Sequence, residues 1–232
     1  MPINRFANKP IAPTVKKRVI VQDLTFPRNT IIPKNALVIS LPSAKKRLSV
    51  TVQAYKATGF EAEIQTVIGV DGMKLKRTES ITIPPGDYGC LLSHKKCIEL
   101  AKENKWPCVL IIEDDVTFID GFSERIKKAM SELPENWDML WLGGLPREQN
   151  EPYSESLDRM FGSWGTYGYV IRDTMYLTVL NILSQEKLIY SVDDYFGRIH
   201  GKHNSFRTRV NYIIHTGEKS DRKLINTKKA DE

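Results

Sequence analysis

Three consecutive carboxylic acids, Glu113, Asp114 and Asp115, are the residues whose type and spacing most clearly indicate chemistry. They directly follow the apolar run 108–112. Negative charges held this close repel one another unless a cation or hydrogen-bond donors offset them. A hard divalent cation does so and can bridge to phosphate oxygens. Glu113 and Asp115 flank a single residue, so an irregular turn lets both face one ion. A solvated turn that caps the next helix is the alternative interpretation.

Short apolar runs alternate with helical patterns, which indicates an α/β fold with a mainly parallel sheet. We predict strands over 36–41, 64–70, 108–112, 138–142, 166–171 and 212–215. We predict helices from a cap at Ser43 to Thr58, from Asp87 or Ser93 to about residue 100, and over 122–133, 173–183 and 192–200. Ligands of open α/β sheets bind beyond the carboxyl ends of the strands, where the run 108–112 delivers its three acids.

The length of 232 residues fits one large domain or two small ones. Residues 1–35 contain five prolines and offer only Val19-Ile20-Val21 as a short strand. We interpret 1–35 as an N-terminal extension or accessory segment and 36–232 as the main domain.

The net charge of +6 and the pI near 9.1 favour acidic partners. However, the basic residues form only short clusters, such as Lys16-Lys17-Arg18 and Lys45-Lys46-Arg47, without a zinc-finger spacing, an RNP-like motif or an aromatic-basic repeat. We therefore expect a solvated basic surface and no nucleic-acid partner.

The three cysteines, Cys90, Cys97 and Cys108, are odd in number and lack a CxxC or Cys/His motif. This disfavours a disulfide framework and a structural zinc and favours a reducing compartment. No apolar run reaches signal-peptide length at the N-terminus or the roughly 20 residues of a membrane span. We expect a soluble, cytoplasmic protein without a transmembrane segment, and leave homo-oligomerisation open.

Seven short motifs follow one another between residues 36 and 221. They are Val38-Ile39-Ser40-Leu41 with Arg47, Val70-Asp71-Gly72, Gly89-Cys90-Leu91-Leu92-Ser93-His94, Ile111-Ile112-Glu113-Asp114-Asp115-Val116, Trp137-Asp138-Met139-Leu140-Trp141-Leu142-Gly143, Gly165-Thr166-Tyr167-Gly168-Tyr169-Val170-Ile171 and Val192-Asp193-Asp194-Tyr195. In this order they resemble the motifs of glycosyltransferase family 25, the lipopolysaccharide and collagen galactosyltransferase group. No single motif is decisive, but seven in register hardly arise by chance. Two departures are the segment 1–35, which has no counterpart, and His215 before Ser220-Asp221, where the family tends to carry Gln.

The resemblance implies a GT-A-like (Rossmann-like) α/β domain over 36–232, with a mainly parallel sheet flanked by helices. It further implies an inverting, metal-dependent hexosyltransferase that moves galactose or glucose from a UDP-sugar. The acceptor would be a saccharide or another hydroxylated molecule, so the implied partners are a nucleotide sugar and a glycan or glycosylated acceptor. The implied cofactor is Mn²⁺ or Mg²⁺.

Roles for individual residues follow from this resemblance. The metal would be held by Glu113 and Asp115, with His215 as a further ligand, because imidazole suits Mn²⁺. A surface histidine at a strand end is the alternative for His215. The donor would be bound by Leu41, Arg47, Asp71, Gly72, Ser93, His94, Asp114 and Thr166, with Asp114 near the ribose or the sugar.

Inversion requires a base that deprotonates the acceptor hydroxyl. We choose Asp194 narrowly over Asp193, and helix capping by Asp193 is the alternative. Ser93 and His94 do not indicate a hydrolase triad, because neighbouring side chains of a helix point in different directions. Of the aromatic residues among the glycines of 162–169, Trp164 is the best candidate for an acceptor platform.

Two other functions remain open at this stage. One is a binding protein for nucleic acid or an anionic surface that has kept the fold but lost catalysis. The other is a metal-dependent phosphohydrolase or nucleotidyltransferase that uses the same carboxylates. The pair Asp193-Asp194 and the glycine- and aromatic-rich segment favour sugar transfer.

Overall fold

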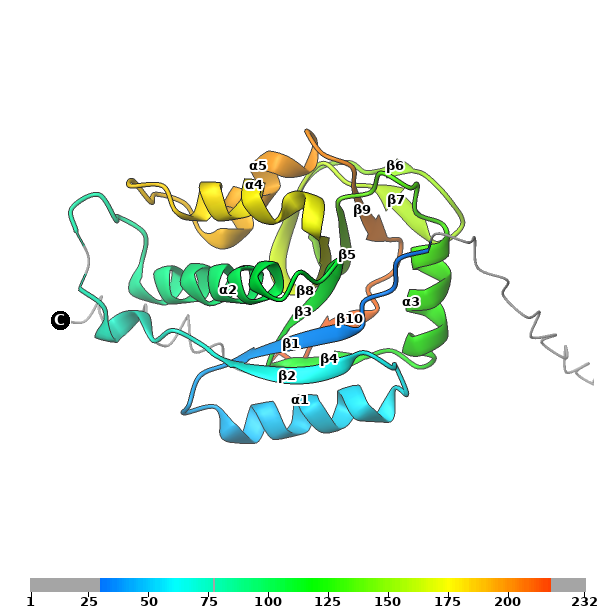
Figure 1. Ribbon diagram of the computed structural model, residues 1–232, viewed down its shortest axis with the longest axis horizontal. Helices are drawn as coiled ribbons and strands as arrows, with labels where there is room; N and C mark the ends of the chain where they lie inside the picture. The colour runs from blue at the N-terminus through cyan, green and yellow to red at the C-terminus, as the bar shows by residue number, and fades with distance from the viewer. Residues whose placement is uncertain (1–29, 77, 218–232) are drawn as a thin grey trace, which may run out of the picture.

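A computed structural model describes residues 30–76 and 78–217 of the chain (Figure 1). Most of the predicted extension 1–35, including Val19-Ile20-Val21, lies outside these residues, as do Ser220 and Asp221. None of the helices in the described part combines the length and the apolar character that crossing a membrane requires.

One mixed sheet of eight strands forms the centre of the molecule, in the order β2-β1-β3-β8-β5-β9-β7-β6. Strands β2, β1 and β3 are parallel neighbours, β8 runs antiparallel between β3 and β5, and β9 is parallel to β5. The mainly parallel α/β sheet is therefore confirmed, with β8 and β7 as its reversed strands. The strands are β1 (Asn35–Ser40), β2 (Glu63–Ile68), β3 (Cys108–Glu113), β5 (Met139–Pro146), β6 (Glu151–Pro152), β7 (Leu157–Arg159), β8 (Ser163–Arg172) and β9 (Ser205–Thr208).

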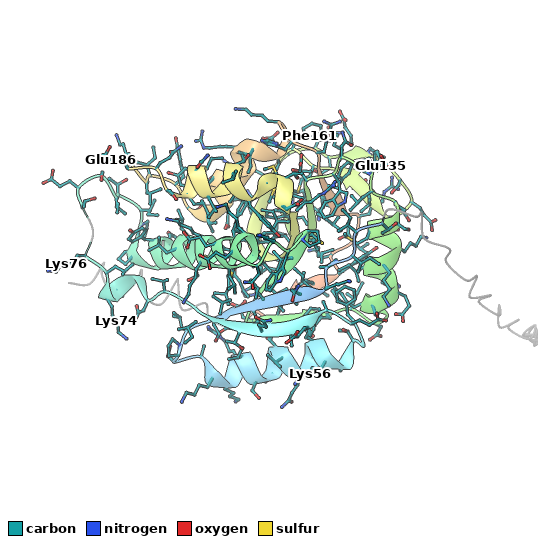
Figure 2. The ribbon with its side chains drawn as sticks, in the orientation of Figure 1. Lys56, Lys74, Lys76, Glu135, Phe161 and Glu186 are labelled. Atoms are coloured by element: carbon teal, nitrogen blue, oxygen red, sulfur yellow. The ribbon has the colours of Figure 1, made fainter. Side chains whose placement is uncertain are left out.

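Helices cover both faces of this sheet (Figure 1). One face carries α2 (Pro85–Glu103), α4 (Asp173–Leu183) and α5 (Val192–His200), and the other carries α1 (Lys45–Ala57) and α3 (Phe122–Ser131). On α1, Tyr55 is buried against the sheet, whereas its neighbour Lys56 points away from it (Figure 2).

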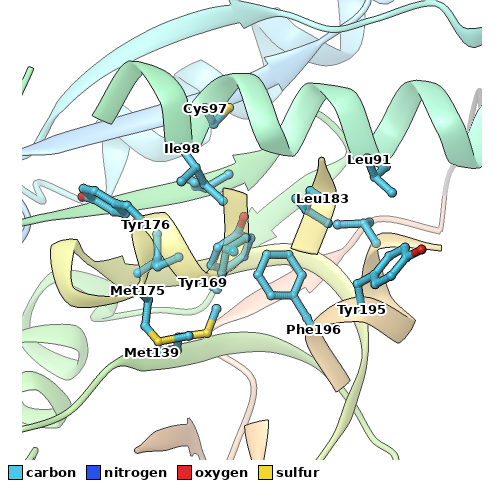
Figure 3. Close-up of a cluster of buried hydrophobic side chains, with 14 of the residues drawn as sticks. Leu91, Cys97, Ile98, Met139, Tyr169, Met175, Tyr176, Leu183, Tyr195 and Phe196 are labelled. Atoms are coloured by element: carbon cyan, nitrogen blue, oxygen red, sulfur yellow. The ribbon is translucent and has the colours of Figure 1, made fainter. Parts of the chain in front are cut away.

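Two hydrophobic cores result, one on each face. Alternate residues of β3 enter alternate cores, since successive side chains of a strand point to opposite faces: Val109 and Ile111 enter the first, and Leu110 and Ile112 the second. A strand covered on both faces must be apolar throughout, which explains the run that ends at the three acids. Figure 3 shows the first core, in which Leu91 and Ile98 point from α2 toward α4 and α5.

A two-stranded antiparallel sheet of β4 (Val116–Phe118) and β10 (Ile213–His215) crosses the end of the main sheet. A Cβ atom on Gly143 would lie 2.4 Å from the Ile213 carbonyl oxygen, and one on Gly168 would lie 2.6 Å from Ile213 Cδ1. Only glycine lets β10 pass this close to β5 and β8. The register pairs His215 with Val116, which brings the histidine next to Asp115.

The predicted strands and helices are present, but two predicted starting points are wrong. Ser43 does not cap α1, because Ala44 occupies the N-cap position and makes no side-chain capping bond. The second helix starts before Asp87 and Ser93, at Pro85, where proline is favoured because the first turn has no partner for the missing N–H. The short strands β4, β6, β7 and β9 were not predicted.

A close contact between α2 and the loop after β2 generates a stability prediction. A Cβ atom on Gly89 would lie 2.4 Å from the Val70 carbonyl oxygen and 2.7 Å from the Gly72 nitrogen. We expect Gly89→Ala to lower the free energy of unfolding by about 1–3 kcal/mol, although alanine is the better helix former. Urea denaturation measures this. Gly197→Ala on α5 is the matched control, because its Cβ would meet only the flexible end of Arg147; equal losses in both variants would contradict the prediction.

Candidate active site

A cavity of about 800 Å³ opens at the carboxyl ends of β1 and β3. Six of the seven sequence motifs contribute residues to its wall, together with β10; the motif 137–143 contributes none, and β5 reaches the wall through Leu145. Its lining includes Leu41, Arg47, Gly69, Val70, Gly72, Cys90, Ser93, His94, Glu113, Asp114, Asp115, Leu145, Trp164, Thr166, Tyr167, Asp193, Ile214 and His215. Six of the seven sequence motifs therefore converge on one cavity at the edge of the sheet where α/β proteins bind ligands.

Both carboxylate oxygens of Asp114 are held by protein groups. Its Oδ2 accepts a hydrogen bond of 2.5 Å from Ser40 Oγ, and its Oδ1 lies 3.0 Å from the Arg47 guanidinium. Thr51 of α1 donates to the Asp114 carbonyl oxygen at 2.8 Å. Asp114 thus orients Arg47 at the cavity wall and also lines the cavity, so its predicted contact with the ribose or the sugar stays a prediction.

Asp115 has one carboxylate oxygen with a partner and one without. Its Oδ2 lies 3.2 Å from His215 Nε2, whereas its buried Oδ1 has no hydrogen-bond partner among the described residues. Burial, and next the negative charge of Glu113, raise the pKa of Asp115 from its ordinary value of 3.8 to about 6, while His215 acts in the opposite direction. An acceptor that is buried, crowded by like charge and unsatisfied fits the requirements of a divalent cation.

His215 has a defined ring orientation. Its Nδ1 accepts a hydrogen bond of 2.9 Å from the Gly217 backbone N–H. A neutral imidazole that accepts at Nδ1 carries its proton on Nε2, the ring nitrogen that lies 3.2 Å from Asp115 Oδ2. Coordination of a metal through Nε2 would require the proton to move to Nδ1 and the Gly217 N–H to turn away.

Glu113 and Asp193 share a single hydroxyl. Thr166 Oγ1 lies 3.1 Å from Glu113 Oε1 and 3.2 Å from Asp193 Oδ1, and Asp193 Oδ2 also accepts a bond of 3.0 Å from the Gly165 N–H. A hydroxyl has one proton and cannot donate to both carboxylates at once. Thr166 therefore joins the end of β3 to the start of α5.

The two neighbouring acids of α5 face different surroundings. Asp193 is buried and lines the cavity, whereas Asp194 lies outside the lining, 2.8 Å from the guanidinium of Arg147. The helix is capped by Ser191, whose Oγ accepts from the Asp194 N–H, and not by Asp193. The geometry thus places the predicted alternative base, and not the preferred one, at the cavity.

Ser93 and His94 act through separate contacts, as expected for neighbours on a helix. Ser93 Oγ donates to the Gly89 carbonyl oxygen at 2.7 Å and accepts from the Val70 N–H at 2.8 Å, which fixes the loop after β2. His94 Nδ1 lies 3.0 Å from the Tyr169 hydroxyl, and the two rings are stacked.

Of the other residues predicted to bind the sugar donor, some line the cavity and one lies outside its lining. Leu41 and Gly72 line the cavity, but Asp71 does not: its carboxylate accepts from the Met73 N–H and pairs with Lys74 at 3.3 Å. Trp164 lines the cavity with 43% of its surface exposed, and the Arg147 guanidinium lies 4.2 Å from its ring centre.

Sequence reasoning gave no role to Ser40, although it stands in the first motif, and it missed Thr51 and Arg147, which no local pattern distinguishes from other polar residues. It also missed Cys90, whose spacing of four residues from His94 on one helix was an available signal.

Comparisons with known proteins agree with this arrangement. The family model described as glycosyltransferase family 25 (LPS biosynthesis protein) matches residues 34–196, more than half of the chain. A protein of Acanthamoeba polyphaga mimivirus named procollagen lysyl hydroxylase and glycosyltransferase is 32% identical over 50% of this chain and 14% of its own length. Procollagen galactosyltransferase 2 of Homo sapiens is 25% identical over 48% of this chain and 22% of its own length. The chain thus spans less than a quarter of either relative.

Other relatives are named as inactive. Inactive glycosyltransferase 25 family member 3 of Homo sapiens is 30% identical over 47% of this chain and 18% of its own length.

Among solved structures, a glycosyltransferase involved in the glycosylation of the major capsid of PBCV-1 covers 85% of this chain and 98% of its own, with a TM-score of 0.52 and 10% identity. That likeness shows the GT-A-like α/β fold. Together with the family model over 34–196, these findings show that the chain belongs to glycosyltransferase family 25.

Proposed function

We propose that this chain transfers a hexose, galactose or glucose, from a UDP-sugar to a hydroxyl group of a saccharide or another hydroxylated acceptor, with inversion and with the help of Mn²⁺ or Mg²⁺. The observation that carries the proposal is the buried Oδ1 of Asp115, which has no hydrogen-bond partner among the described residues and belongs to the wall of a cavity large enough for a nucleotide sugar. Membership of family 25 and the name of the human galactosyltransferase relative support the reaction and the sugar.

Asp115 and Glu113 are the proposed protein ligands of the cation. His215 is the proposed third ligand, once its ring proton has moved from Nε2 to Nδ1. A cation held there supplies Lewis-acid stabilisation of the charge that develops on the departing nucleoside diphosphate. The orphaned Asp115 oxygen and the repulsion from Glu113 support this assignment, because a positive ion relieves both.

The donor is proposed to lie along the wall formed by Leu41, Arg47, Gly72 and Thr166. Asp114 and Ser40 hold the guanidinium of Arg47 at this wall, where its planar donors suit phosphate oxygens. Gly72 lines this wall, and a Cβ atom there would lie 1.7 Å from the Pro85 carbonyl oxygen, so only glycine lets the loop after β2 pack against the start of α2.

Asp193 is the proposed base. As the acceptor oxygen forms its bond to the anomeric carbon and the bond from that carbon to the diphosphate breaks, the hydroxyl proton passes to the Asp193 carboxylate. The Gly165 N–H and the Thr166 hydroxyl hold this carboxylate at the cavity. Its place in the lining and the pairing of Asp194 with Arg147 support Asp193 over Asp194.

Trp164 is the proposed platform for the acceptor. Its indole lies at the cavity wall with 43% of its surface exposed, and exposed aromatic faces suit the apolar faces of sugars. Arg147 packs against this ring and pairs with Asp194, so it would hold the platform in place.

A second candidate function is donor or glycan binding without catalysis, which the names of the inactive relatives favour. Such a protein would bind the UDP-sugar and leave it intact in the presence of an acceptor. A phosphohydrolase or nucleotidyltransferase on the same carboxylates would instead release phosphate or exchange nucleotide without glycosylating the acceptor.

The cation proposal predicts the effect of Asp115→Asn. In the wild type, Mn²⁺ with UDP-galactose or UDP-glucose at 100 times its dissociation constant should stabilise the fold by about 2.7 kcal/mol. Asp115→Asn should lose the Mn²⁺-dependent part of this shift in a thermal unfolding assay. The matched control Asp120→Asn changes an exposed acid after β4 and should keep it. A shift of wild-type size in Asp115→Asn would remove Asp115 from the site.

The raised pKa of Asp115 also predicts that the free energy of unfolding of the metal-free chain depends on pH. The pKa of Asp115 is about 6 in the folded chain against an ordinary 3.8, so between these values the folded state binds more protons than the unfolded state. Its free energy of unfolding therefore falls as the pH rises through this interval. Relative to Asp115→Asn, the wild type should lose about 1–3 kcal/mol between pH 4 and pH 7, measured by urea denaturation in chelator. A difference that stays constant with pH would argue against this account.

The assignment of the base is tested by paired variants. Asp193→Asn should lower kcat about 100-fold or more, because the isosteric amide keeps the shape of the side chain and one acceptor oxygen for the Gly165 N–H but takes up no proton. Asp194→Asn should lower kcat far less and should mainly raise KM for the acceptor, since Arg147 loses its partner. The readout is UDP release that depends on the acceptor. Equal losses of kcat in the two variants would contradict the choice of Asp193.

A further inference from the structure

Cys90, His94 and Glu113 form a cluster at the wall of the same cavity. One ligand atom of each residue lies within 4.8 Å of the ligand atoms of the other two. Cys90 and His94 are four residues apart on α2 and therefore share one face of the helix, and Glu113 reaches them from the end of β3. Among the described residues, this is the group in which three side chains capable of binding a metal come this close together.

His94 is prepared as a ligand. It is fully buried, and its Nε2 has no hydrogen-bond partner within the described residues, although Glu113 Oε1 lies 3.5 Å away. Its Nδ1 is 3.0 Å from the Tyr169 hydroxyl. Donation from Nδ1–H to this hydroxyl leaves the Nε2 lone pair directed into the cluster. Metal-bound histidines are commonly oriented by such a bond from the other ring nitrogen.

The ligand set differs in chemistry from the neighbouring carboxylate pair. Thiolate is a ligand that zinc accepts readily, whereas Mn²⁺ and Mg²⁺ prefer oxygen, so Cys90 is what distinguishes this set from Asp115, Glu113 and His215. Ligand atoms of a tetrahedral zinc site are about 3.3–3.8 Å apart at the usual bond lengths, so small side-chain rotations would close the cluster around the ion. A fourth position would face the cavity.

The other two cysteines cannot take this role. Both are buried among apolar side chains. Burial raises the pKa of the Cys97 thiol well above its usual range and that of Cys108 to about 12, so neither forms the thiolate that a metal requires. Cys90 alone combines partial exposure with a place in the cavity wall.

We propose that Cys90, His94 and Glu113 form a second cation site, selective for zinc, and that zinc bound there inhibits the enzyme. Glu113 would be drawn from the Thr166 hydroxyl, which it now shares with Asp193, and from the proposed Mn²⁺ site. The ion would also occupy part of the donor cavity. The binding half of this proposal is independent of the proposed function, and the inhibition half rests on it.

Cobalt(II) is the probe for binding, because a thiolate ligand gives it a charge-transfer band in the near ultraviolet. The metal-free full chain should show this band, and zinc should remove it by displacement. Cys90→Ser should lack the band and bind zinc at least about tenfold more weakly by calorimetry. Cys97→Ala, on the same helix but outside the cluster, should keep both. Circular dichroism checks that each variant is folded.

Two results would overturn the zinc site: cobalt binding without a thiolate band in the wild type, or a band that persists in Cys90→Ser. Asp115→Asn separates this proposal from the enzymatic one, because it should lose the Mn²⁺ effect but keep the thiolate–cobalt band. The inhibition half is tested by the ratio of activity with and without zinc within each protein. This ratio should fall in the wild type and stay near one in Cys90→Ser; equal inhibition of both would overturn it.

Discussion

The repulsion among three carboxylates at the end of β3 is the constraint on which the rest of the site depends. Each acid is compensated by a different part of the chain: Asp114 by Ser40 and Arg47, Asp115 by His215, and Glu113 by Thr166. Strands β1, β8 and β10 and helix α1 must therefore meet at this point for the fold to tolerate the charge. Compensation is incomplete at Asp115, whose second oxygen has no partner in the described structure. That remaining deficit is what makes the site receptive to a cation.

Close backbone approach is what allows these elements to converge. Gly143 and Gly168 admit Ile213 of β10, and Gly89 admits the loop after β2. A side chain at any of these positions would push one wall of the cavity away from the acids. The glycines in the motifs therefore serve the same end as the charged residues, since they set how closely the donors and acceptors of separate elements approach.

The sequence allowed the sheet, its two-sided cover and the edge that carries the acids to be predicted, because these follow from apolar periodicity and from the general placement of ligands in α/β sheets. The directions of individual side chains could not be predicted. Adjacent residues of a helix point about 100° apart, so Asp193 and Asp194 look alike in sequence but reach the cavity and Arg147 respectively. Likewise, the contacts of Asp114 with Ser40 and Arg47 could not be predicted, because both partners belong to elements far from it in the sequence.

Glu113 has a particular position because it borders two sets of ligands with different chemistry. On one side lie the oxygens of Asp115 and the proposed manganese, and on the other lie the sulfur of Cys90 and the nitrogen of His94. One carboxylate can complete only one of these sets at a time, so the two proposed ions would compete for Glu113. Selectivity between the two ions then follows from ligand softness, and not from the shape of the cavity. The same reasoning applies to the Thr166 hydroxyl, which can donate its single proton to Glu113 or to Asp193 but not to both. When one of these carboxylates moves away, the hydroxyl donates to the other.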